Sequence, residues 1–509
     1  MAYTSADSFS DDDESDDPSK PWKQNPLLID LIVSRILSFL PEKQLFKLRL
    51  VHPIWNQEAT HLIQQNYLFH VKKAALNKLE IQDTFPFTPR HLKVTVDSVL
   101  KPYRSVLENL FGTLGTEIKS LSINCENQYF TRLYSEEVLN LFLANVPNLT
   151  SLELSIPIKI TEKSALYPPG AKILNFPRLK RVSFSQYEPG GGYSIGFTKD
   201  IFGSAPNLES LRVETRTLDV ITRVLIALKD HEEFAHTLTT LELDCNISEI
   251  HMEMLNEMSD TVLANLKCLQ LSYFTQQVES TTLESFLLKH QNRIEKLVIG
   301  DSKRRGTNAP LFTIRLPRMP NLKILTLVDP CFGQERQLNF APFAYEQQWP
   351  QLKSILFYHE QGNPTGFQCY RDILYSKCDT VEELEFHDGI IDAERVLTSV
   401  AAMFVNVTRL VVKNLSDDAI RSVWRNMEQI KDLELHFGVQ NHDLDSVITG
   451  IPGEVCRKIQ ENNLFSQINA MDLLTVIRTE ESICNLKSKK FMIFFDTCLY
   501  ALLGPLLIL

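Results

Sequence analysis

The chain has 509 residues, of which 44% are apolar and 23% are charged, and its formal net charge at pH 7 is −11. A chain of this length and composition can bury a large core, and its negative charge argues against nonspecific nucleic-acid binding. The nine cysteines form no CxxC pair, and the first 20 residues lack a signal-peptide pattern. We therefore expect free thiols and a cytoplasmic or nuclear protein.

An acidic segment opens the chain. Residues 8–17 read SFSDDDESDD. Like charges repel one another, and the segment has little apolar surface to bury. Residues 1–22 are therefore predicted to be a disordered acidic tail.

The next segment carries helical patterns. Apolar residues recur at intervals of three and four between Ile29 and Leu40, as in an amphipathic helix, and Pro41 ends the series. A second apolar series begins at Leu45 and contains Pro53, so we expect its helix to break or kink there. A helical unit of this size buries its own apolar surface poorly. It therefore needs a partner, or contact with the rest of the chain.

A six-residue pattern, apolar-x-x-apolar-x-apolar, dominates the rest of the chain. Its twelve copies begin at Ile118, Leu149, Leu179, Leu208, Leu238, Leu266, Ile294, Leu322, Leu352, Val381, Val407 and Ile430. Successive copies start 23 to 31 residues apart, which indicates one structural unit stacked on copies of itself. Five copies follow a proline, as in Pro206-Asn207-Leu208, where it would stop the preceding helix.

Each unit is predicted to be a strand followed by a crossover. The last positions of the pattern alternate apolar and polar, as in a strand with one buried face. A parallel neighbour requires a crossover connection, and helices are predicted from Ser135 onward and over 281–290. A (β/α)8 barrel has units of similar length, but twelve strands are too many for it. Barrel strands are also buried on both faces, whereas these carry polar residues on one.

The repeats resemble the leucine-rich-repeat family over residues 118–445. The resemblance implies an α/β solenoid with a curved parallel sheet on the concave side and helices outside. The family's usual asparagine, three residues past the last apolar position, is present only as Asn246, so irregular repeats are expected. We assign residues 73–117 to a linker and N-terminal cap, and residues 446–490 to a C-terminal cap.

Residues 23–72 resemble an F-box. The matching text is NPLLI at 25–29, ILSFLP at 36–41, LRLVH at 48–52, and Trp55-Asn56 with Ala59. The chain departs from the family at Ile29-Asp30, where Leu-Pro is usual, and at His52, where Cys is frequent. Pro53 is also unusual, so a distorted second helix is expected.

The F-box resemblance implies docking on the Skp-family adaptor of cullin–RING ubiquitin ligases. The adaptor contacts that it implies are Leu28, Ile29, Ile32, Ile36, Leu37, Leu40, Leu45 and Leu48. The alternative is that these residues only pack the helices together. Val51 and Trp55 suit such an internal core equally well.

An F-box followed by leucine-rich repeats implies the substrate-recognition subunit of an SCF-type ligase. Such a protein positions a target, while the cullin and RING partners supply the ubiquitin chemistry. We find no catalytic, cofactor or metal motif; Gly190-Gly191-Gly192, for example, lacks the lysine and helix of a phosphate loop. The alternatives are an interaction scaffold with a vestigial F-box and, as a third hypothesis, a barrel-type enzyme.

The concave face is the predicted target-binding surface. Its strand positions are polar in most repeats but become apolar in repeats seven to nine, and later repeats add acids. The predicted contacts are Val298, Ile324, Val328, Leu356, Tyr358, Glu383 and Glu385. Exposed apolar patches mark binding sites, so we expect a groove for an apolar anchor with basic flanks. The alternative is that the C-terminal segment folds back and buries the patch.

The last 19 residues, 491–509, form an apolar tail that reads FMIFFDTCLYALLGPLLIL. Its length is near the minimum for a membrane span, so a tail anchor is one interpretation. Asp496 and Pro505 argue against it. The other interpretations are a buried end cap of the solenoid and an artefact of gene prediction.

Overall fold

The structure is a computed structural model. It describes residues 30–40, 42–71, 89–96, 104–125, 142–155, 175–186, 195–215, 217–274, 278–300, 313–314, 316–328, 339–340, 345–358, 377–387, 393–413, 423, 426–427, 429–437 and 490–495. The predicted acidic tail 1–22 and most of the predicted cap 446–490 lie outside these residues.

One parallel sheet runs through the described part of the chain. It has 15 strands in chain order, so each strand pairs with the one before it and the one after it. The strands are β1 (Leu68–Val71), β2 (His91–Val96), β3 (Ser120–Cys125), β4 (Ser151–Ser155), β5 (Arg181–Gln186), β6 (Ser210–Thr215), β7 (Thr240–Ile247), β8 (Cys268–Phe274), β9 (Lys296–Gly300), β11 (Ile324–Val328), β13 (Ser354–Tyr358), β14 (Glu383–Phe386), β15 (Arg409–Lys413), β16 (Asp432–Phe437) and β17 (Lys490–Phe495). A second, two-stranded sheet joins β10 (Thr313–Ile314) to β12 (Asn339–Phe340).

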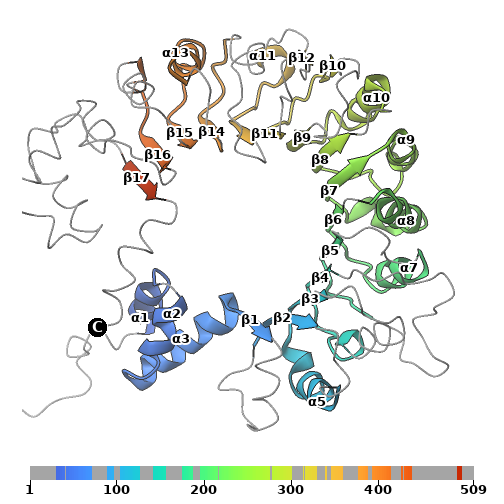
Figure 1. The fold of residues 1–509 in the computed structure, drawn as a ribbon, viewed down its shortest axis with the longest axis vertical. Helices are drawn as coiled ribbons and strands as arrows, with labels where there is room; N and C mark the ends of the chain where they lie inside the picture. The colour runs from blue at the N-terminus through green and yellow to red at the C-terminus, as the bar shows by residue number, and fades with distance from the viewer. Residues whose placement is uncertain are drawn as a thin grey trace, which may run out of the picture.

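The sheet curves, with strands on the inside and helices on the outside (Figure 1). The outer helices are α5 (Arg104–Leu114), α7 (Ile195–Gly203), α8 (Leu218–Lys229), α9 (Glu249–Met258), α10 (Ser280–His290), α11 (Tyr345–Gln348) and α13 (Ala393–Met403), with short 3-10 helices at Gly115–Glu117 and Glu232–His236. This confirms the predicted α/β solenoid. A closed barrel is excluded because β1 and β17 are the two ends of the strand order.

All twelve predicted repeat strands are present, as β3 to β9, β11 and β13 to β16. Their second apolar positions align in register, for example Leu241 with Leu269 and Leu297 with Leu325. These side chains are fully buried between the sheet and the outer helices. The helix predicted over 281–290 is confirmed as α10. Of the helix predicted from Ser135, residues 135–141 lie outside the described residues, and residues 142–144 are helical.

The sheet extends beyond the limits predicted for the repeats. Strands β1 and β2 precede residue 118, and β2, which lies in the range assigned to the linker and N-terminal cap, pairs directly with β3. Strand β17 extends the other end by pairing with β16. The six-residue pattern misses these strands because its first position is Asn66, Pro89 and Ser488, respectively, instead of a large apolar residue.

An asparagine ladder links the turns of neighbouring repeats. Asn148, Asn207, Asn265, Asn321 and Asn406 each stand just before a repeat and donate a side-chain hydrogen bond to a carbonyl of the preceding turn, over 2.6 to 3.2 Å. Each such bond contributes about 1 kcal/mol to stability. These bonds join neighbouring repeats at the entrance of five of the strands.

Three helices precede the solenoid: α1 (Asp30–Leu37), α2 (Glu42–Leu48) and α3 (Pro53–Asn66). Asp30 begins α1. The break expected at Pro53 is confirmed, but the helix is not distorted there. Pro53 occupies the first turn of α3, where its missing N–H costs nothing, and His52 Nδ1 accepts a hydrogen bond from the Ile54 N–H at 3.2 Å.

Candidate functional site

The helical unit has a small core of its own. Its buried residues are Val33, Leu37, Leu45, Ala59, Leu62 and Ile63, and Trp55 packs against them. Two predicted adaptor contacts, Leu37 and Leu45, therefore lie inside the unit and are 0% and 5% exposed. The interpretation of these two positions as internal packing is the one that the structure supports.

Other apolar residues of the helical unit face outward. The predicted contacts Ile32 and Ile36 are 38% and 36% exposed, Leu40 and Leu48 are half-buried, and Leu28 and Ile29 lie outside the described residues. Leu31 and Phe39 are 80% and 71% exposed and were not predicted. We call Leu31, Ile32, Ile36 and Phe39 the α1 face.

The sequence contained a signal for the α1 face. Leu31 and Phe39 fall off the helical spacing that defines the buried side, so they are apolar residues in excess of what the core needs. The guanidinium of Arg35 lies 4.9 Å from the centre of the Phe39 ring, a cation–π contact at the edge of this face. After α2, Leu50 and Val51 are also exposed, so the structure disfavours the internal-core interpretation that the sequence left open for Val51.

The concave face brings the predicted target contacts onto neighbouring strands. Register places Val328 beside Tyr358, and Leu356 beside Glu385. Tyr358 is 42% exposed, whereas Val298 and Val328 are only 6% and 7% exposed. The two valines therefore lie in the surface of the sheet beneath Tyr358 and offer little area to a target.

The predicted acids Glu383 and Glu385 belong to an ion-pair cluster around Arg409. Arg409 donates to Glu383 and also lies 3.9 Å from Glu385 and 3.3 Å from Glu434. His387 Nε2 lies 2.9 Å from Glu385, and this hydrogen bond, together with the charges of His387 and Arg409, lowers the pKa of Glu385. We call Glu383, Glu385, His387, Arg409 and Glu434 the Arg409 cluster.

A second charged group lies in the middle of the concave face. Arg212 contacts Glu214 at 3.1 Å and Glu242 at 4.0 Å. Burial, with the nearby charge of Glu214, raises the pKa of Asp244, which also receives a hydrogen bond from Ser272. Three carboxylates face the one guanidinium of Arg212, so this group also carries excess negative charge, but no apolar side chain predicted to bind a target accompanies it.

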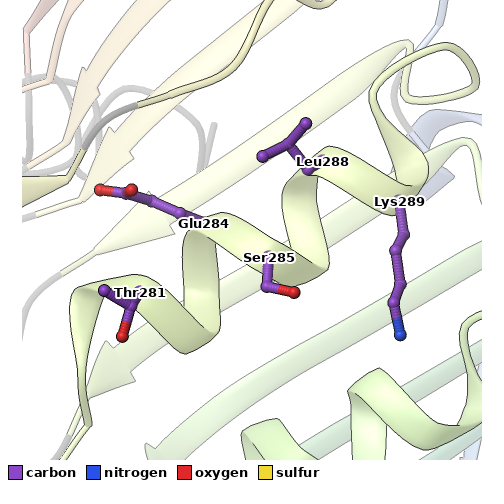
Figure 2. Close-up of a pocket in the computed structure, with 5 residues that line it drawn as sticks. All are labelled: Thr281, Glu284, Ser285, Leu288 and Lys289. Atoms are coloured by element: carbon purple, nitrogen blue, oxygen red, sulfur yellow. The ribbon is translucent and has the colours of Figure 1, made fainter.

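The outer surface carries a depression of about 540 Å³ at α10. Its lining residues Thr281, Glu284, Ser285, Leu288 and Lys289 all belong to that one helix, as Figure 2 shows. A ligand site needs polar groups that converge from several elements. This depression has lining residues from one element, so we do not assign a site to it.

Metal and membrane sites are also absent from the described residues. Within the ranges given above, no three His, Cys, Asp or Glu side chains gather as metal ligands. Nor does any helix there combine the length and apolar character needed to cross a bilayer. Residues 491–495 of the apolar tail form most of β17, which fits the end-cap interpretation of that segment, and residues 496–509 lie outside the described part.

Comparison with known proteins gives only distant likenesses, all of them to solved structures. No protein-family model and no curated protein matches the chain. Among solved structures, the chain is similar to one described as the crystal structure of the Rad7 and Elc1 complex in yeast, at 14% identity and a TM-score of 0.36. The match covers 80% of this chain and 87% of that one. A likeness this distant identifies neither a family nor a partner.

Proposed function

We propose that this chain is the substrate-recognition subunit of an SCF-type cullin–RING ubiquitin ligase. The α1 face binds the Skp-family adaptor, which connects the chain to the cullin and RING subunits. The concave face of the solenoid binds the protein to be ubiquitinated. The chain contributes positioning, and its partners carry out the ubiquitin transfer.

One observation carries this proposal: α1 has apolar residues on two of its faces. Val33 and Leu37 face the core of the helical unit, while Ile32 and Ile36 are exposed together with Leu31. An isolated helical unit gains nothing from a second apolar face, whereas a docking helix requires one. The residues between 25 and 59 that resemble an F-box indicate which partner this helix would bind, namely a Skp-family adaptor.

Co-purification of the full chain with a Skp-family adaptor tests the proposal. The native chain should retain the adaptor, and Ile36→Asp should lose it, because an unpaired carboxylate would be buried at the contact. The expected loss is about 100-fold in affinity, or about 3 kcal/mol. Circular dichroism of Ile36→Asp should remain native because Ile36 is not part of the buried core of the helical unit.

Gln57→Asp is the matched control. Gln57 is an exposed polar residue of α3, so the same new charge there should leave adaptor binding unchanged. Retention of the adaptor by Ile36→Asp would contradict the proposed contact. Failure of the native chain to retain any adaptor would leave the alternative function, an interaction scaffold built on the solenoid.

A further inference from the structure

Three apolar side chains lie together on the concave face, at positions that are polar in most other repeats. Ile324 on β11 is partly exposed, as is Leu356 on β13, and Tyr358 at the end of β13 is 42% exposed. Strands β11 and β13 are direct neighbours, about 4.8 Å apart. The three side chains therefore form one surface, which we call the Tyr358 patch.

The residues beside and behind the Tyr358 patch are tightly packed. Val298 and Val328, which belong to the same concave rows, are packed to 6% and 7% exposure. Phe357, on the opposite side of β13, stacks on Phe386 with ring centres 4.9 Å apart. An apolar group that binds the patch would meet a rigid surface, so little side-chain ordering would oppose binding.

Negative charge borders the patch on its β14 side. Three carboxylates, Glu383, Glu385 and Glu434, share the single guanidinium of Arg409. Even with His387 protonated against Glu385, the Arg409 cluster keeps an excess negative charge. Arg409 is already surrounded by carboxylates, so the cluster favours an added cation over an added anion.

Positive charge lies on the other side of the patch. Lys296 on β9 is exposed and is in register with Ile324. Glu383 lies three strands away in the same row, which corresponds to about 14 Å. An extended peptide spans that distance with about four residues.

From this arrangement we infer that the Tyr358 patch binds an extended peptide segment of a target protein that has an apolar or aromatic centre and a Lys or Arg on one side. The apolar centre sits on Leu356 and Tyr358, and the basic residue faces the Arg409 cluster. This inference rests on the proposed role of the solenoid as the target-binding part of a ligase. The negative charge of the cluster selects among segments that share the same apolar centre.

Fluorescence anisotropy with three short labelled peptides tests the inference on the full chain. The first peptide carries Leu-Phe followed by Arg-Arg in a Gly-Ser background. The second replaces Leu-Phe with Ser-Ser, and the third replaces Arg-Arg with Glu-Glu. The first should bind about tenfold tighter than either of the others, and its advantage over the Glu peptide should shrink in high salt.

Two variants locate the binding. Tyr358→Ala should weaken the first peptide about tenfold, whereas Ser151→Ala, a concave position on the distant β4, should change nothing. Glu383→Gln with Glu434→Gln should weaken the Arg peptide and strengthen the Glu peptide. This second variant keeps side-chain volume, so it tests the charge preference without removing a large side chain.

Several outcomes would overturn the inference. They are equal binding of the three peptides, no binding tighter than about millimolar by any of them, and an unchanged preference in the double Gln variant. A large fall in melting temperature for Tyr358→Ala would show instead that the chain covers the patch itself. The measurement needs no adaptor, so its failure is distinct from failure of the proposed ligase role.

Discussion

Acidification from about pH 7.5 to pH 5 is expected to lower the free energy of unfolding by about 4 kcal/mol, through two buried histidines. Burial lowers the pKa of His251 and the pKa of His290, each to about 4. Both side chains are at most 1% exposed. Their ordinary pKa is about 6.5, so between about pH 6.5 and pH 4 the two histidines bind protons in the unfolded chain but not in the folded chain.

The sign follows from the direction of the shift. A histidine whose folded pKa is lowered contributes stability that is fully present above about pH 6.5 and is lost as the pH falls toward about 4. At about pH 5 each histidine accounts for about 2 kcal/mol of the loss. Urea denaturation at the two pH values measures the difference directly.

His290 gives the sharper test of the two histidines. Neither of its ring nitrogens has a hydrogen-bond partner among the described residues, and its ring packs on Phe286 with centres 4.7 Å apart. His251 is bonded to Thr222 and Ser248. His290→Leu should therefore match or exceed native stability at about pH 7.5 and remove half of the acid loss. If the free energy of unfolding of His290→Leu fell with pH as steeply as that of the native chain, the acid loss could not be assigned to His290.

Truncation should destabilise the helical unit far more at Leu37 than at the adjacent residue Ile36. Leu37→Ala is expected to lower the free energy of unfolding of the helical unit by about 2 to 5 kcal/mol, because it opens a cavity in a small core. Ile36→Ala should cost less than about 1 kcal/mol because Ile36 is already exposed. Native-state hydrogen exchange of the α3 amides measures both effects, since it reports local opening.

This contrast decides how binding losses are interpreted. A variant of Leu37 or Leu45 that fails to bind an adaptor has lost its fold, whereas a variant of Ile36 that fails has lost a contact. Equal destabilisation by Leu37→Ala and Ile36→Ala would show that both faces of α1 are buried. The α1 face would then be part of a larger core and would be unavailable to a partner.

Much of the fold is predictable from the sequence because the apolar positions of the repeat pattern are the positions that become buried. Each of the twelve copies has apolar residues where the strand meets the outer helices, and each forms a strand. Strands β1, β2 and β17 escape the pattern because their first position holds Asn66, Pro89 or Ser488 instead of a large apolar residue. The outermost strands β1 and β17 have a neighbour on one side only, so this position need not fill a core shared by two repeats.

The binding surfaces are less predictable because exposure is a property of the tertiary structure. The sequence shows that Val298 and Tyr358 are both apolar at concave positions, but it cannot show that Val298 is packed between Gln270 and Thr326 while Tyr358 stands at the end of its strand. On α1, the residues that match the F-box mix both faces of the helix. Only the packing of α1 on α3 separates Leu37 from Ile36.

Hydrogen–deuterium exchange of the full chain, alone and with a Skp-family adaptor, tests the central claim most directly. The account predicts slower exchange in α1 and in residues 42–51 when the adaptor is present, with no change in β11, β13 and β14. The concave face would then be free for a target while the chain is held by its helical unit. Protection of the concave strands without protection of α1, or no protection anywhere, would contradict the account.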